Sequence, residues 1–160
     1  KVNDMKTILQ RGKEVQEQIN ILGDDGVPVE YHLTFWKSEV IDFVILQQDA
    51  FDKIDSVCPI ERQEYMLNLV MDICHSDFKF NGFLEVMDYF KGIINICKQM
   101  NYSEFKSENF EKYLAELNSV LAERRRVWRE AADTFSFKEI VTRKTTWTFL
   151  LPDIVLSDKN

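Results

Sequence analysis

The apolar residues of this chain recur every three or four positions over most of its length, and this spacing constrains the fold more than any other feature. In the first segment, about residues 3–22, the recurring apolar residues are Met5, Ile8, Leu9, Val15, Ile19 and Leu22. Because an α-helix makes one turn every 3.6 residues, side chains at these intervals share one face that can pack against a core. The sequence therefore predicts an amphipathic helix over this segment.

The same spacing returns in four later segments, which turn-forming residues separate. Residues 23–28 concentrate glycine, aspartate and proline; Gly23 suits a left-handed helix cap, and Pro28 suits the first turn of the following helix. The later helices are predicted at about residues 29–46, 59–77, 83–97 and 110–131. The fourth helix is expected to be central because its apolar face is broad. The sequence therefore predicts an all-α fold, a helical bundle of about five helices.

The pattern changes from Ser136 onward. β-Branched and aromatic residues dominate residues 140–142 and 145–151, and Pro152 closes the second stretch. This composition is typical of short strands or an extended arm. We expect residues 1–135 to form one helical bundle domain and residues 136–160 to form an appended tail that is extended or β-like.

The composition is that of one soluble globular domain. A chain of 160 residues with 45% hydrophobic and 29% charged residues can bury an adequate core. The net charge of -7 disfavours nucleic acid and anionic membranes as partners, because both attract basic surfaces. No apolar run approaches the roughly 20 residues of a membrane-spanning helix, so we expect no direct membrane insertion. The chain begins with Lys1 inside a helical pattern, which suggests an excised part of a longer protein.

Few residues suggest catalysis or metal binding. The three cysteines lack the spacing of a metal site or a CxxC motif, which fits a reducing compartment. His32 and His75 lie far apart, outside any cluster of zinc ligands. No glycine opens a phosphate-binding loop. Asp52 and Asp55 are interpreted as turn and helix-capping residues, since no cleft partner accompanies them. We predict no catalytic residue and no metal site.

The run of residues 46–67 is the most distinctive string in the chain. Its characteristic residues are Leu46, Gln47, Gln48, Ala50, Phe51, Asp52, Asp55, Cys58, Pro59, Glu61, Gln63, Met66 and Leu67. This ungapped string closely resembles the C-terminal region of the catalytic A subunit of V/A-type rotary ATPases. Residues 8–23 resemble that family's helix before its rotor-facing turn. The chain departs from the family at Asp49, where Asn is usual, and at Val57, where an aromatic residue is common.

The resemblance implies that the chemistry lies elsewhere in a longer subunit. In that family an N-terminal barrel and a central P-loop domain precede this region, and ATP is hydrolysed at the interface with the neighbouring B subunit. Mg-ATP is then a ligand of the full-length subunit, whereas this part holds no cofactor and is inactive alone. The resemblance also implies a cytoplasmic place in the soluble sector, peripheral to the membrane.

For this part of the subunit the resemblance implies a mechanical function. Nucleotide binding closes the C-terminal domain toward the central stalk, and the turn of its first hairpin pushes on the rotor subunit. The residues of that rotor-contacting turn are Gly23, Asp24, Asp25, Gly26, Val27, Pro28 and Glu30. Without the resemblance, the same residues are a hydrophilic turn whose acids stabilise the start of the next helix.

Phe51 is the second position that the resemblance singles out, because the matching stretch of the family runs beside the adenine pocket. Phe51 either stacks on the base or packs under the turn as a hydrophobic anchor, and both interpretations stay open. The alternative function for the whole chain is a non-enzymatic helical adaptor, which binds a partner helix through a groove or an acidic loop.

Overall fold

The structure is a computed structural model, which describes residues 1–125. Within these residues every regular element is helical, which confirms the all-α prediction. The α-helices are α1 (Val2–Leu22), α2 (Val29–Ile41), α3 (Ile60–His75), α4 (Phe83–Asn101) and a fifth helix at residues 108–125. The 3₁₀ turn η1 (Asp24–Gly26) follows α1, and the π-helical turn η2 (Asp42–Leu46) continues α2. The predicted tail, residues 136–160, lies outside the described residues.

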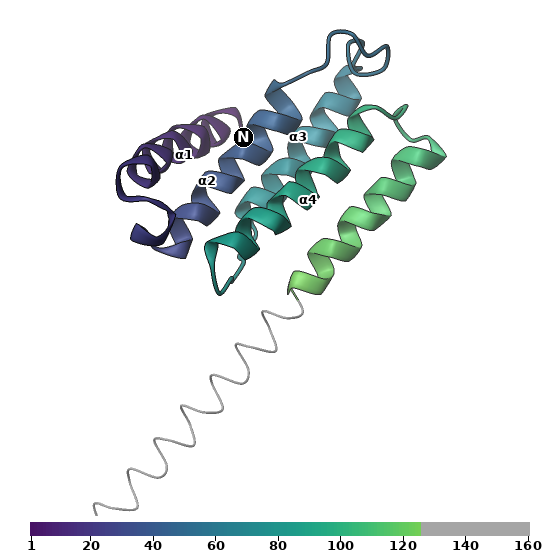
Figure 1. The fold of residues 1–160 in the computed structure, drawn as a ribbon. Helices are drawn as coiled ribbons and strands as arrows, with labels where there is room; N and C mark the ends of the chain where they lie inside the picture. Colours follow the sequence, from purple (N-terminus) through teal and green to yellow (C-terminus); the bar gives the residue numbers. More distant parts are fainter. Residues whose placement is uncertain (126–160) are drawn as a thin grey trace, which may run out of the picture.

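The helices form an antiparallel array with α4 near its centre (Figure 1). The residues of α4 that are fully buried are Val86, Phe90, Ile93, Cys97 and Met100. They pack in one cluster with apolar residues of α2, α3 and the fifth helix. These contacts confirm the prediction that the fourth helix is central. The physical reason is that a helix covered by several neighbours needs a broad apolar face.

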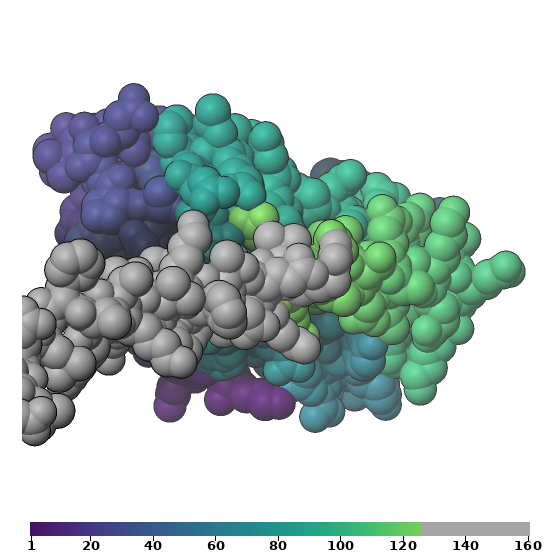
Figure 2. Space-filling model, turned by 90° about the horizontal axis from the view of Figure 1, so that it is seen from below, coloured from purple at the N-terminus to yellow at the C-terminus, as the bar shows by residue number. Residues whose placement is uncertain are grey.

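Helix α1 lies at the edge of the array, where it packs chiefly along α2. Only Gly12 and Val15 of α1 are buried. Figure 2 shows the fifth helix, in green, on the side of the bundle away from the indigo residues near the turn of residues 23–28. The hairpin of α1 and α2 is therefore an arm attached to the bundle through α2.

The helix boundaries differ from the predicted ones in four places. Gly23 has a positive φ of 81°, but its ψ of 164° is not that of a left-handed cap. Pro28 and Pro59 have ψ of 150°, so each lies just before its helix and not in its first turn. The second predicted helix is α-helical only to Ile41, since a wider turn with a bond from Gln47 N to Asp42 O replaces its last residues.

Candidate functional site

The turn of residues 23–28 is exposed at one end of α2. Apart from Val27, which is half-buried, all its residues and Glu30 are open to solvent. The turn is nevertheless held in place, because the buried His32 side chain has its Nε2 atom 3.0 Å from the Asp24 carbonyl oxygen. The His32 ring also stacks on Phe83, with the ring centroids 5.2 Å apart. The two bracing contacts give the turn a fixed position on the bundle.

Two apolar residues beside this turn are exposed, which the sequence pattern did not predict. Ile21 is 81% exposed and Leu22 is 60% exposed, and both belong to the last turn of α1. The periodicity assigned Leu22 to the buried stripe, but α1 ends there and the chain turns away from its neighbour. The tip of the arm thus presents an apolar pair next to Asp24 and Asp25, which both lie in η1.

The loop of residues 47–59 lies at the other end of α2 (Figure 1). Phe51 on this loop is 98% exposed. That exposure rules out the interpretation of Phe51 as an anchor packed under the turn. Leu46, Val57 and Ile60 are exposed as well, so this end of the bundle carries a concentration of exposed apolar side chains.

Short-range hydrogen bonds shape the loop. The Asp52 Oδ1 atom accepts hydrogen bonds from the backbone N–H groups of Ile54 and Asp55, each at 2.8 Å. The Asp49 Oδ1 atom accepts one from the N–H of Phe51 at 2.9 Å. Such side-chain bonds to the backbone two or three residues ahead stabilise turns. They confirm the interpretation of Asp52 as a turn residue.

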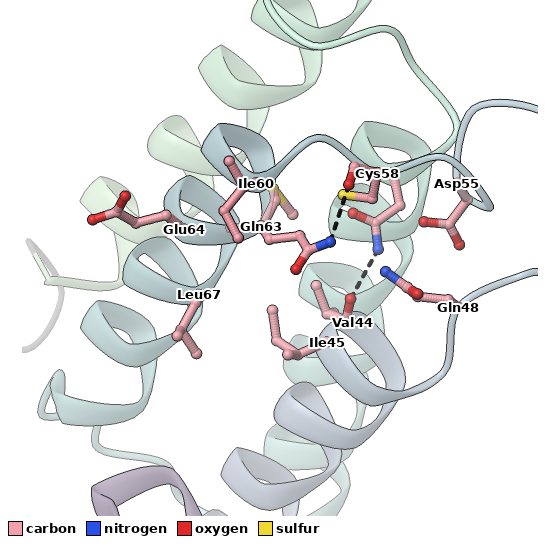
Figure 3. A pocket seen from close by; sticks show the side chains of 11 residues that line it. Val44, Ile45, Gln48, Asp55, Cys58, Ile60, Gln63, Glu64 and Leu67 are labelled. Atoms are coloured by element: carbon pink, nitrogen blue, oxygen red, sulfur yellow. Dashed lines mark hydrogen bonds between the residues drawn. The ribbon is translucent and has the colours of Figure 1, made fainter. Parts of the chain in front are cut away.

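A cavity of about 390 Å³ opens beside this loop (Figure 3). Its apolar wall includes Ile45, Ile60 and Leu67, and its polar groups include Gln48 and Gln63. The Gln63 Nε2 atom donates a hydrogen bond to the Cys58 carbonyl oxygen at 3.0 Å, which holds the rim of the cavity. The mixed lining suits an apolar group that carries a few hydrogen-bonding atoms.

The cysteines and histidines have structural surroundings. Cys74 and Cys97 are buried, and burial raises the pKa of each thiol to about 12. Cys58 lines the cavity and is half-buried; burial raises the pKa of its thiol too. The exposed His75 lies 2.8 Å from an Asp4 carboxylate oxygen, an ion pair that ties α1 to α3 when the ring is protonated.

The described part of the chain holds neither a cluster of metal-ligating side chains nor a membrane-spanning helix. Residues 1–125 hold no group of three or more His, Cys, Asp or Glu side chains that could bind a metal ion. None of the helices in this part is long and apolar enough to cross a membrane. The described residues therefore offer protein surfaces and a cavity as candidate sites, at the two ends of α2.

Known proteins similar to this chain include V-type ATP synthase alpha chains. Residues 1–79 match the family described as the C-terminal domain of V and A type ATP synthase. The V-type ATP synthase alpha chain of Protochlamydia amoebophila is 34% identical over 125 residues, which are 78% of this chain and 21% of that protein. The V-type ATP synthase alpha chain of Borrelia duttonii is 35% identical over 116 residues, 72% of this chain and 20% of that protein.

A third relative, the V-type ATP synthase alpha chain of Treponema denticola, is 30% identical over 119 residues, which are 74% of this chain and 20% of that protein. The chain thus spans about a fifth of the length of the curated relatives it matches. The matched residues include α1, α2, the exposed turn and the loop of residues 47–59. The chain belongs to the family of the C-terminal domain of V and A type ATP synthase.

Proposed function

We propose that this chain is the lever domain of the catalytic A subunit of a V/A-type ion-translocating ATPase. In this proposal it couples ATP hydrolysis or synthesis to rotation of the central stalk. The observation that carries the proposal is the course of α2. Together with η2, it runs without a break from the exposed turn of residues 23–28 to the exposed loop of residues 47–59.

A continuous helix is a suitable transmission element because its backbone hydrogen bonds keep its length fixed. At 1.5 Å per residue, residues 29–46 span about 25 Å. Packing against α1 on one side and against α3 and α4 on the other supports α2 along this length. A push on either end therefore displaces the other end instead of bending the helix.

The loop end is proposed to face the nucleotide-binding interface between the A subunit and the neighbouring B subunit. Mg-ATP would bind to the full-length A subunit, and Phe51 would lie on the adenine side of that site. The 98% exposure of Phe51 supports this role, since an aromatic ring in water has both faces free for stacking. The phosphate-binding and catalytic groups would come from other parts of the complex.

The tip is proposed to contact the rotor subunit of the central stalk. The tip presents two exposed aliphatic side chains, Ile21 and Leu22, next to the negatively charged side chains of residues 24–30. Apolar contact supplies affinity, whereas exposed charges contribute little individually because water and salt screen them. The domain would work on the cytoplasmic side, in the soluble sector peripheral to the membrane.

The test is a single-molecule rotation assay on a complex whose A subunit carries this chain. Deletion of residues 24–27 shortens the tip without removing core residues, so we expect hydrolysis to continue with loss of torque. Replacing Asp24, Asp25 and Glu30 by Ala is the control and should leave most of the torque. Undiminished torque in a folded deletion variant would show that the turn is not the pushing element.

The cavity favours a second candidate function, a non-enzymatic helical adaptor that takes an apolar group of a partner between α2 and α3. The two functions differ in what the parent reading frame encodes. A P-loop upstream of Lys1 supports the lever, and an upstream region without one supports the adaptor.

A further inference from the structure

We infer that Arg62 and Asn101 are positioning residues that join the loop of residues 47–59 to the π-helical end of α2, so that the two move together. The mechanical meaning of this link rests on the proposed lever function. The link itself is a property of this chain and can be tested without a rotor. Its members are the Val44 carbonyl group, Asp55, Arg62 and Asn101, which we call the buried polar link.

Arg62 is the centre of the link. It belongs to the first turn of α3, and its side chain is only 1% exposed. The guanidinium Nη1 atom donates a hydrogen bond to the Ile54 carbonyl oxygen of the loop at 3.3 Å. The Nη2 atom donates to the Asn101 carbonyl oxygen and lies 3.8 Å from the Asp55 Oδ1 atom. One side chain of α3 thus holds both the loop and the end of α4.

Asn101 extends the link to α2. It is the last residue of α4, is buried, and donates a hydrogen bond from its Nδ2 atom to the Val44 carbonyl oxygen at 2.9 Å. Val44 lies in η2, where the widened turn ends the helix. Carbonyl groups at the end of a helix lack partners within it, and a buried one needs a donor from elsewhere. Asn101 supplies that donor from another helix.

Asp55 closes the loop on itself. Its buried carboxylate accepts a hydrogen bond at Oδ2 from the backbone N–H of Asp49 at 2.7 Å, while Oδ1 faces Arg62. The beginning and the end of the loop are therefore held by the same carboxylate. A displacement of the loop must either break these bonds or carry Arg62, Asn101 and the end of α2 with it.

Burial of apolar groups holds the loop only weakly, which leaves this task to the polar link. The large apolar side chains Phe51 and Val57 point into solvent, and Ile54 is only half-buried. A buried arginine is also a costly way to fill space, and the Arg62 Nε atom has no hydrogen-bond partner among residues 1–125. Buried polar networks do fix one geometry, because each alternative leaves groups unsatisfied. We take that fixed geometry to be the function of Arg62.

The first experiment measures amide hydrogen exchange in the 160-residue chain. Arg62→Met and Asn101→Leu remove side-chain donors at similar volume, and we expect exchange at Gln47, Asp49 and Asp55 to become at least tenfold faster. Amides of the α4 core should keep their protection. The matched control is Arg124→Met, which removes a partly buried arginine paired with Glu85 at 2.7 Å on a different part of the bundle. It should leave the loop unchanged.

The second experiment separates coupling from simple support. Asp52→Ala removes the loop's hydrogen bonds to the backbone of Ile54 and Asp55 at the loop end of the link. Amide chemical shifts report how far this disturbance travels. We expect shifts along α2 in the otherwise unchanged chain, and shifts confined to the loop when Asn101→Leu is also present. Equal shifts along α2 for Asp52→Ala alone and for Asp52→Ala combined with Asn101→Leu would overturn the proposal. So would loop exchange in Arg62→Met no faster than in Arg124→Met.

If Arg62→Met does not fold, the Asn101→Leu pair of measurements decides, because that change leaves the Arg62 contacts to Ile54 and Asp55 in place. If Asn101→Leu has the expected effects on exchange and shifts but the deletion of residues 24–27 leaves the torque undiminished, the lever is refuted and the link stands. If that deletion loses torque but Asn101→Leu has no effect on exchange or shifts, the link is refuted and the lever stands. Failure of the link and failure of the proposed function are therefore distinguishable.

Discussion

Gly12 of α1 lies so close to Ser38 of α2 that a Cβ atom added at Gly12 would come within 1.9 Å of the Ser38 Oγ atom and 2.3 Å of its Cβ atom. Ser38 is buried, and its hydroxyl donates a hydrogen bond to the Phe35 carbonyl oxygen of its own helix at 2.6 Å. The hydroxyl therefore needs no hydrogen-bond acceptor from α1. Close approach at this one point is what allows α1 to pack along α2.

Gly12→Ala should therefore separate the two helices of the arm. The added methyl group meets the Ser38 Cβ atom as well as its hydroxyl, so rotation of the hydroxyl cannot relieve the clash. We expect a loss of about 1–3 kcal/mol in the free energy of unfolding, the usual cost of overpacking. Urea denaturation followed by circular dichroism measures it.

Gly92→Ala is the control for this prediction. Gly92 is exposed within α4, and a Cβ atom there meets nothing within 4 Å. Alanine at an unhindered helical position should raise stability by about 0.5–1 kcal/mol. Equal effects of the two substitutions would contradict the close helix contact at Gly12.

The buried thiol of Cys97 predicts how stability changes with pH. Burial raises its pKa from 9.0 to about 12, so the folded chain binds a proton that the unfolded chain releases between these values. The corresponding stability is complete below about pH 9 and is lost as pH rises toward 12. Cys97→Ala should make the decline of unfolding free energy over pH 9.5–11 shallower, by up to about 1.4 kcal/mol per pH unit.

Denaturation at a series of pH values measures these slopes. Cys58→Ala is the comparison, since its thiol is half-buried and should contribute less to the slope. Identical slopes in Cys97→Ala and the unchanged chain would mean that the thiol titrates alike in both states.

The arrangement of helices could be predicted from the sequence because burial along a helix is a local, periodic property. The first four predicted helices overlap α1, α2, α3 and α4, with only their ends displaced. Helix ends depend on neighbours instead. Leu22, Leu46 and Ile60 fit the apolar pattern, yet they lie at ends where no helix covers them.

The buried polar link could not be predicted from local periodicity. Asn101 and Val44 are 57 positions apart, and Arg62 and Asn101 are 39 apart. No local pattern connects residues at these separations. The π-helical turn takes part in the same long-range contact, since the Asn101 side chain donates to its Val44 carbonyl group. Phe51, in contrast, could be singled out through the family resemblance, and its exposure needed the structure.

Phe51 should matter to nucleotide use in the complex and hardly at all to the isolated chain. Because its side chain is 98% exposed, Phe51→Ala should change the free energy of unfolding by less than about 0.5 kcal/mol. In a complex containing this chain, the same change should raise KM for ATP. Steady-state hydrolysis measures KM, and an unchanged value would remove Phe51 from the adenine side.

Isothermal titration of the isolated chain with Mg-ATP complements that measurement. We expect no turnover and at most very weak binding, since one aromatic contact supplies only a small part of the binding energy of a nucleotide. Submicromolar affinity would reveal a nucleotide site within this chain.

The exposed pair at the tip gives the most direct test of rotor contact. Ile21 and Leu22 are 81% and 60% exposed, so Ile21→Ser together with Leu22→Ser should cost the folded chain little, within about 1 kcal/mol for the pair. If the pair is buried against the central-stalk subunit, its removal forfeits the free energy of burying two aliphatic side chains, about 1.5–3 kcal/mol each at full burial. We therefore expect at least a tenfold weaker complex, equivalent to about 1.4 kcal/mol.

Biolayer interferometry with the purified central-stalk subunit measures this affinity. The matched control is Val2→Ser, an aliphatic residue that is 53% exposed at the opposite end of the same helix. Its affinity should equal that of the unchanged chain. Because the acids of the tip remain in both variants, a selective loss in the double variant assigns the contact energy to apolar burial. Equal affinities in all three proteins would place the rotor contact elsewhere on the domain.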